Sequence, residues 1–522
     1  MSFRALKTRL SAISSRPALL ILLGISVALI GLRTFSLLLL PMFYDEALHI
    51  SRAQSILTEH TLLVATKGGK FLHTWLIALV LPLADNPLLA ARALSVVMGV
   101  LAGIGCYLLA RHLYQRDDVA LIAVALYALA PFTLFHDRMA LADGLLNALG
   151  IWSLLFSLVA VRQGRWWQIL GLGVCLGSAV ATKLSGITLA SFPLLAAWLW
   201  RGDLSRRRIW LTVLAAWLLL IPGLLPAGLD ITEQYESTVS HSWVGSEIAG
   251  SAYPALLSQN LGAIAAILWN YLTPPLLLLA LAEVGLSLRQ RDKSTWLLAL
   301  AALVTPIFFL LIVNEKFYPR YLLPAAPFLL ILAARCLVAL TDWLRERQPW
   351  PARRFRWGLL AGLFLLASPF AIQFDYLLLT DPPRAAWMPS DHWQYVAGWP
   401  AGYGVIDAVA YLRQQADELG AIVAVKRNSV RMNAGSWVHY LNQPGISLEP
   451  IDFDRKDPQS LIQPLGNTHA PVFVILDYPQ EERFTDAFVK GPYAPYSTLV
   501  ATFPRPGGES QVQVYRITTG PQ

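Results

Sequence analysis

Long apolar runs separated by short polar connections dominate the chain up to residue 375. A helix that crosses the hydrocarbon core of a bilayer needs about 20 mainly apolar residues. A segment at 71–84 is apolar but too short to cross, so we interpret it as re-entrant or interfacial. The sequence predicts about 11 transmembrane helices, near residues 17–40, 92–110, 119–135, 141–161, 166–182, 184–200, 209–228, 263–288, 295–313, 321–340 and 357–374.

A second kind of pattern occurs in the first polar connection, residues 42–91. Between 44 and 57, Ala47, Ile50, Ala53 and Leu57 recur at helical spacing, with polar residues between them. Such spacing predicts an amphipathic helix that lies on the membrane surface.

The basic residues define a topology. The N-terminal segment is basic, and the apolar run after it is too long for a signal peptide and lacks a small-residue cleavage site, so we expect a retained first span with a cytoplasmic N-terminus. Alternate connections are then cytoplasmic, and each carries Lys or Arg, whereas the predicted outer loop 229–262 carries acidic residues and neither Lys nor Arg. The chain is therefore predicted to be a multi-pass protein of the cell (plasma or inner) membrane. The cytoplasmic connections are 111–118, 162–165, 201–208, 289–294 and 341–356.

Composition agrees with this topology. With 56% hydrophobic and 14% charged residues, the chain is too apolar for an ordinary soluble globular protein. The net charge of +8 is concentrated in the connections, so membrane orientation explains it and no nucleic-acid partner is expected. Cys106, Cys175 and Cys336 all lie in apolar stretches, which indicates neither a disulfide framework nor a zinc site.

The tail, residues 376–522, has an ordinary soluble composition after a connector rich in Pro and Trp. It is predicted to be an extracytoplasmic α/β domain, whereas residues 1–375 form the transmembrane domain. A helix is expected near 404–419, closed by Gly420, and strands are expected at 421–426, 472–476, 498–503 and 512–517.

Ionisable residues at membrane depth are costly and are candidates for function. In this chain they gather at the predicted outer ends of the spans. A carboxylate there can deprotonate an acceptor, and a Lys or Arg can neutralise a leaving phosphate, so the mixture suits sugar transfer from a lipid phosphate. The residues are Asp45, Glu46, Lys67, Lys70, His73, His136, Asp137, Arg138, Asp143, Lys183, Glu315, Lys316 and Arg320.

Each acidic candidate also has a structural interpretation. Asp45 can cap a helix that begins near Ala47, and Glu46 suits the dipole of its first turn. Arg138 and Asp143 can form an interfacial ion pair that fixes the depth of two helices.

The remaining candidates have structural interpretations as well. Lys67 and Lys70 can snorkel to lipid headgroups. Lys183 lies in a short turn where a purely structural lysine is plausible, and a lone histidine such as His73 is more often structural than catalytic.

The ordered motifs resemble the C-type glycosyltransferases of the protein O-mannosyltransferase group, which includes the aminoarabinose transferases that act on lipid A. One departure is the stretch Gly-Gly-Lys-Phe-Leu, where the family often has Lys/His-Pro-Pro-Leu, so the equivalence of Lys67 or Lys70 stays open. The similarity covers roughly residues 17–340. The matching motifs are Tyr44-Asp45-Glu46, Gly69-Lys70 with Leu72-His73 and Trp75-Leu76, Arg92, Asp137-Arg138 through Asp143, Ala181-Thr182-Lys183 through Gly186, and Lys316 through Arg320-Tyr321 to Pro324.

The resemblance implies a membrane enzyme that uses a polyprenyl-phosphate sugar donor and inverts the anomeric carbon. Asp45 would be the catalytic base, supported by Glu46, and Asp143 would complete the acidic site. The acceptor would be a lipid, a glycan or a protein. No cofactor is implied, and a divalent metal stays open. The donor phosphate would meet Lys70, Arg138, Lys183 and Arg320, with Tyr44, Lys67, His73 and Tyr321 as further substrate contacts.

Two other functions compete with this hypothesis. A transporter or flippase of lipid-linked sugars would show charged groups at mid-membrane and paired broken helices with repeat symmetry, and the sequence indicates neither. A scaffold whose outer domain binds a partner would tolerate loss of the carboxylates.

Overall fold

The computed structural model describes two compact units. The described residues are 16–62, 69–200, 205–229, 253–312, 317–347, 353–427, 444–451, 470–478, 489–491, 493–508 and 510–518. Unit one contains the described residues up to Leu37 and those from Ile56 to Leu379, and unit two contains Leu38–Ser55 and the residues from Thr380 onward. The segment Leu38–Ser55, which the sequence places in the transmembrane domain, thus packs with the tail.

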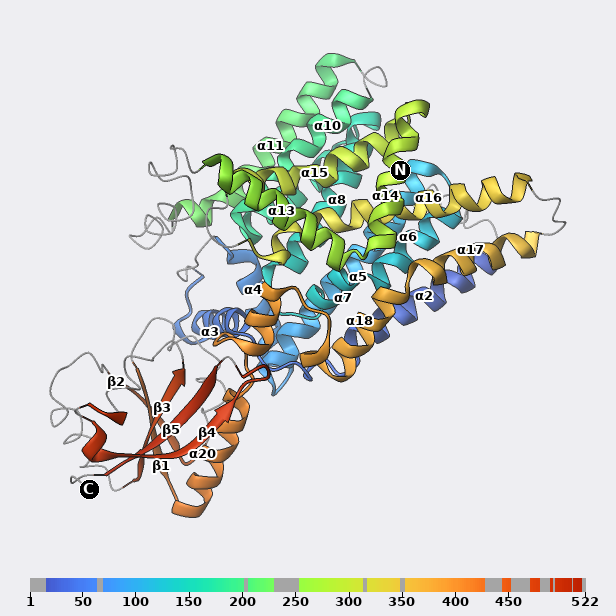
Figure 1. Cartoon of the computed structure of the whole chain (residues 1–522). Coiled ribbons are helices and arrows are strands. Elements are labelled where there is room, and N and C mark those ends of the chain that lie inside the picture. Colours follow the sequence, from blue (N-terminus) through green and yellow to red (C-terminus); the bar gives the residue numbers. More distant parts are fainter. Residues whose placement is uncertain are drawn as a thin grey trace. The chain divides into compact units, whose positions relative to one another are not determined.

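Unit one is built from helices (Figure 1). Apolar residues recur all around the long ones, as expected for helices whose surroundings are other helices and lipid. They are α2 (Arg16–Thr34), α4 (Phe71–Val80), η1 (Leu81–Leu83), α5 (Pro87–Tyr114), α6 (Asp117–Leu129), α7 (Pro131–His136), α8 (Ala142–Gln163), α9 (Trp166–Thr182), η2 (Leu184–Ser191), α10 (Phe192–Leu199), α11 (Arg206–Leu229), α13 (Tyr253–Tyr271), α14 (Pro274–Gln290), α15 (Lys293–Ile312), η3 (Pro319–Ala325), α16 (Ala326–Arg347), α17 (Arg353–Ala367) and α18 (Pro369–Thr380).

Every predicted span overlaps a helix or two successive helices, although α2 ends at Thr34, before the predicted end at residue 40. Among the described residues, five helices are long and apolar enough to cross a membrane alone, and two bent pairs raise that number to seven if each pair is one span. The other four predicted spans are helical but shorter than this length criterion. The apolar segment at 71–84 is a short helix followed by one 3₁₀ turn, too short to cross.

Two predicted spans bend by more than 40° at a break that a proline follows. The span predicted at 263–288 was wrong as a single helix, because α13 and α14 meet at 112°. Thr273 lies at the break with a φ of +69°, and Pro274 follows it. Proline removes a backbone donor and disfavours helix at the residue before it, so the chain turns there. The same effect before Pro369 bends α17 from α18 by 62°.

The connections predicted to be cytoplasmic contact one another. Arg116 pairs with Asp342 at 2.7 Å, which joins connections 111–118 and 341–356. Arg208 Nη2 donates to the carbonyl of Gly164 at 3.3 Å, and Ser294 Oγ donates to that of Leu113 at 3.2 Å. These contacts are those expected of loops on one side of the membrane.

Unit two contains a five-stranded sheet with α20 (Val405–Leu419) against one face (Figure 1). The strand order is β2-β1-β3-β5-β4, with β1 parallel to β2 and β3, and with β5 antiparallel to β3 and β4. Side chains of β1, β3 and β5 alternate between the face under α20 and the opposite face. The strands are β1 (Ile422–Arg427), β2 (Ile446–Ile451), β3 (Val472–Tyr478), β4 (Ser497–Pro504) and β5 (Gln511–Ile517).

The helix predicted near 404–419 and the four predicted strands are confirmed. Gly420 ends α20 at a φ of +85°, which glycine adopts without strain. Strand β2 was missed because Pro450 interrupts its pattern. It is an edge strand, where a missing backbone donor is tolerated. The remaining helical segments include α3 (Tyr44–Glu59), η4 (Pro382–Arg384), α19 (Pro389–His392) and η5 (Trp393–Ala397).

Candidate functional site

Helix ends in unit one carry most of the candidate residues. Asp143 lies in the first turn of α8, where the helix dipole favours a carboxylate. Lys183 is the C-terminal cap of α9, where the dipole favours a cation. Lys70 is the N-terminal cap of α4, and Arg320 follows Pro319 at the start of η3.

These charges converge on Asp143. The Nζ atom of Lys183 lies 2.8 Å from Oδ1 of Asp143, and the two side chains are 15% and 7% exposed. Arg320 and Lys70 also act electrostatically on this carboxylate. We call Lys70, Lys183 and Arg320, gathered around Asp143, the cation cluster. Lysine and arginine side chains form charge-assisted hydrogen bonds with phosphate oxygens, so the cluster has the chemistry of a phosphate-binding site.

Two buried histidines lie within electrostatic range of the same charges. His73 in α4 is acted on by Lys70 and Asp143, and His136 at the end of α7 is acted on by Asp143, Arg320 and Lys183. His136 was not among the residues assigned a role from sequence, although it precedes Asp137 in the quoted motif. The sequence signal that could have identified His136 is a histidine next to two charged residues at a helix end.

Aromatic rings hold the cations in place. The Tyr321 ring stacks on Phe309 with centroids 4.7 Å apart, and Lys183 Nζ lies 4.8 Å from the Tyr321 centroid. Arg320 lies over the ring of Tyr318 at 5.1 Å. A cation over an aromatic face is attracted by the quadrupole of the ring. Tyr321, predicted as a substrate contact, therefore contributes at least the positioning of Lys183.

Arg138 has a different environment from the one predicted for a donor-phosphate contact. Its Nη1 donates to the carbonyls of Leu32, Arg33 and Phe35 at 2.7–3.1 Å, and its Nη2 donates to that of Ser36 at 3.0 Å. The last carbonyls of a helix lack partners within the helix, and Arg138 satisfies those at the end of α2. The alternative ion pair with Asp143 is also not formed, because Asp143 pairs with Lys183.

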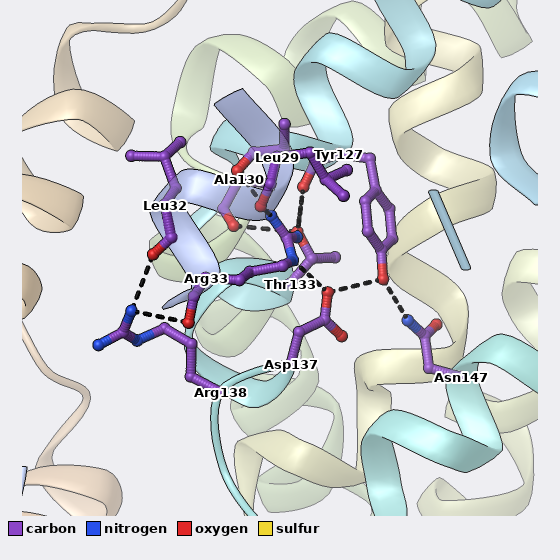
Figure 2. A network of polar contacts seen from close by, with 10 residues as sticks. Leu29, Leu32, Arg33, Tyr127, Ala130, Thr133, Asp137, Arg138 and Asn147 are labelled. Carbon is purple, nitrogen blue, oxygen red and sulfur yellow. Dashed lines mark hydrogen bonds and ion pairs between the residues drawn. The ribbon is translucent and has the colours of Figure 1, made fainter. Parts of the chain in front are cut away.

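A second polar network, which the sequence did not reveal, lies inside unit one (Figure 2). Arg33 Nε lies 2.9 Å from Asp137 Oδ2, and both side chains are fully buried. The Tyr127 hydroxyl donates to the same oxygen at 2.9 Å, and Asn147 Nδ2 donates to that hydroxyl at 3.2 Å. Arg33 fell inside the predicted span 17–40, and an arginine in an apolar span was the available signal.

The acidic pair after the first span belongs to unit two. Helix α3 begins at Tyr44, so Asp45 lies within its first turn and is half-buried. Glu46 is fully buried, and its Oε2 accepts the backbone N–H of Phe43 at 3.0 Å, as in a capping box. The Tyr44 amide donates to the carbonyl of Pro400 at 3.0 Å. Glu46 therefore fixes the start of the helix that carries Asp45.

Two further predictions concern Lys67 and a metal. Lys67, a predicted substrate contact, lies outside the described residues. Within the described ranges, no three His, Cys, Asp or Glu side chains are grouped so that they could hold a metal ion.

Comparison with known proteins places these features in a family context. Residues 69–225 match the model of the family described as dolichyl-phosphate-mannose-protein mannosyltransferase. That stretch contains Lys70, Asp143 and Lys183 but neither Asp45 nor Arg320. A comparison with curated proteins gives no match.

Solved structures match over nearly the whole chain. ArnT from Cupriavidus metallidurans in the apo state has a TM-score of 0.60 at 15% identity, over 97% of this chain and 99% of that one. The same protein bound to undecaprenyl phosphate has a TM-score of 0.60 at 14% identity, over 96% and 98%. The oligosaccharyltransferase of Archaeoglobus fulgidus, in complex with zinc and sulfate, has a TM-score of 0.53 at 13% identity, over 93% and 72%.

At these identities the matches establish the fold. The chain has the membrane fold of the C-type glycosyltransferases, with a C-terminal domain that contains a small sheet. The resemblance predicted from the motifs is confirmed for the fold, and for residues 69–225 it extends to the sequence pattern of the mannosyltransferase family.

Proposed function

We propose that this protein is a membrane glycosyltransferase that moves a sugar from a polyprenyl-phosphate donor to a lipid, glycan or protein acceptor on the extracytoplasmic side. The observation that supports this most is the cation cluster, in which Lys183 pairs with Asp143 at 2.8 Å and Lys70 and Arg320 act electrostatically on the same carboxylate. Lysine and arginine are the side chains that bind phosphate oxygens through charge-assisted hydrogen bonds. The undecaprenyl phosphate bound to ArnT, which shares this fold, supports the same class of donor.

The cluster suits the leaving group of the reaction. When the bond between the anomeric carbon and the phosphate oxygen breaks, the departing polyprenyl phosphate gains negative charge. Fixed cations in a site with little water stabilise that charge strongly. In this proposal Lys183 and Arg320 bind the phosphate and Lys70 adds a third cation. Asp143 holds Lys183 in place at 2.8 Å.

We propose Asp45 as the catalytic base because it lies in the motif Tyr44-Asp45-Glu46. Asp45 follows Tyr44 at the start of α3 and is half-buried, and Glu46 fixes this helix end through the Phe43 amide. Asp45 takes the proton of the acceptor hydroxyl or amine while the acceptor atom attacks the anomeric carbon from the face opposite the phosphate. The sugar is transferred with inversion, and polyprenyl phosphate leaves.

A transfer assay in detergent tests the function. Purified protein is incubated with tritiated polyprenyl-phosphate mannose or aminopentose donors and with membrane lipid, glycan and protein fractions as acceptors. We expect label to move from the donor to one fraction. A matched pair of variants connects this activity to the cluster: Lys183→Gln removes a cation of the cluster, and Lys293→Gln removes an exposed lysine at the start of α15.

The same assay distinguishes a glycosyltransferase from a flippase. A flippase needs a sealed compartment, whereas an enzyme does not. Movement of donor across the bilayer of proteoliposomes, with no transfer in detergent to any fraction, would contradict the proposed function. Equal activity of the two lysine variants would contradict the assignment of the phosphate site.

A further inference from the structure

Three buried arginines hold the C-terminal end of α2. Arg138 donates to the carbonyls of residues 32, 33, 35 and 36. Arg92 Nη1 donates to the carbonyl of Leu37 at 2.8 Å. Arg33 is on α2 itself and reaches toward α6 and α7. Burying a charge in a membrane domain is costly. Three buried arginines at one helix end are therefore candidates for a functional role.

Arg33 fills a gap that a proline creates. Pro131 has no N–H, so the carbonyl of Tyr127, four residues earlier, loses its partner in the helix. That carbonyl accepts from the Thr133 hydroxyl at 2.5 Å and from Arg33 Nη2 at 3.1 Å, and Arg33 Nη1 donates to the carbonyl of Ala128 at 3.2 Å. The positive charge that this brings into the interior is balanced by Asp137, whose Oδ2 lies 2.9 Å from Arg33 Nε.

Asp137 connects this network to the cation cluster. It follows His136, on which Asp143, Arg320 and Lys183 act electrostatically, and it lies in the short connection between α7 and α8. A Cβ atom on Gly144, in the first turn of α8, would lie 3.5 Å from the His136 carbonyl oxygen and 4.0 Å from Asp137 Oδ1. The first turn of α8 therefore packs directly on residues 136 and 137.

The network reaches α8 a second time. The Tyr127 hydroxyl donates to Asp137 and accepts from Asn147, one turn after Asp143 (Figure 2). Asp137 thus packs against the start of α8 at Gly144, and the Tyr127 hydroxyl links it to Asn147, since this hydroxyl donates to Asp137 and accepts from Asn147. We propose that Asp137 is a positioning residue, which by holding Arg33 and Tyr127 fixes the first turn of α8 and thereby aligns Asp143 with Lys183. This proposal rests on the proposed function.

Gly99 offers a way to disturb Asp137 without changing any charge. A Cβ at Gly99 in α5 would lie 2.6 Å from Cγ and Oδ2 of Asp137, so an alanine there must displace the carboxylate. Gly103 lies one turn later on the same helix. A Cβ there would meet only the end of the Leu29 side chain closely, at 2.8 Å. Gly99→Ala and Gly103→Ala are therefore a matched test and control.

The experiment measures the Kd for undecaprenyl phosphate, without a sugar, by tryptophan fluorescence of full-length protein in detergent. Thermal unfolding of each variant is recorded separately. Asp137→Asn and Gly99→Ala should weaken binding by roughly tenfold or more, as expected for a binding group moved by a fraction of an ångström to an ångström. Gly103→Ala should bind as the wild type does. The double variant Arg33→Gln/Asp137→Asn should bind no more weakly than the worse single variant, because the pair acts as a unit.

The outcomes distinguish failure of the proposed function from failure of the positioning role of Asp137. A wild type that does not bind undecaprenyl phosphate contradicts the proposed function. If the wild type binds, unchanged affinity in Asp137→Asn and Gly99→Ala overturns the positioning role, even where both unfold at a lower temperature. Equal weakening by Gly103→Ala also overturns it, because loosened packing would then be sufficient. If both test variants fail to fold, Tyr127→Phe decides, since it removes only the hydroxyl donated to Asp137.

Discussion

The exchange of Lys183 for glutamine tests the cation cluster most directly. The substitution removes the charge 2.8 Å from Asp143 and the cation over the Tyr321 ring, and it leaves an uncharged polar side chain that is one bond shorter. At an effective dielectric constant of about 20, two unit charges at this separation attract by about 6 kcal/mol, of which desolvation offsets a large part. The variant should still fold, because Arg320 and Lys70 also act on Asp143.

The effect on activity should be large. Removal of one fixed electrostatic partner of a developing negative charge costs roughly 100-fold to 1,000-fold in rate. We expect kcat/KM for the labelled donor to fall by this amount in Lys183→Gln, and Lys183→Arg, which keeps the charge, should retain more activity. Lys293→Gln is the control variant with which kcat/KM of Lys183→Gln is compared. Wild-type kcat/KM in Lys183→Gln, with unfolding temperature also unchanged, would refute the assignment of Lys183 to the phosphate.

Three further substitutions address other parts of the molecule. Asp45→Asn should abolish sugar transfer while undecaprenyl phosphate still binds, because only the proposed base is lost; measurable transfer at the wild-type rate would remove Asp45 from the mechanism. Arg138→Gln should lower the unfolding temperature and the stability by about 3 kcal/mol as carbonyls at the end of α2 lose their donors, with a smaller change in Kd than Lys183→Gln causes; the reverse pattern would restore Arg138 as a phosphate contact. Asp477→Asn leaves the buried guanidinium of Arg505, 2.7 Å away, without its counter-charge, so unit two should lose about 3–5 kcal/mol of stability; chemical denaturation that shows no loss would contradict this.

Most of the helices and strands could be predicted from the sequence because their signals are local. An apolar run or an alternating pattern is read within one segment, and so α20 and four of the five strands were found. The breaks at Thr273 and Ser368 were missed, although both precede prolines, because an apolar run across a proline still satisfies a length criterion. Strand β2 was missed because its place at the edge of the sheet, which tolerates Pro450, is a property of the sheet.

The candidate residues were also found from sequence, but their partners were not. Sequence alone indicated that Asp143, Lys183 and Arg320 lie at helix ends and that the basic connections share one side. Only the tertiary structure decided that Asp143 pairs with Lys183, that Arg138 holds the end of α2, and that Arg33 is buried against Asp137. The physical reason is that an ionic contact depends on a few ångströms of packing between helices distant in the chain, and no local pattern records that distance.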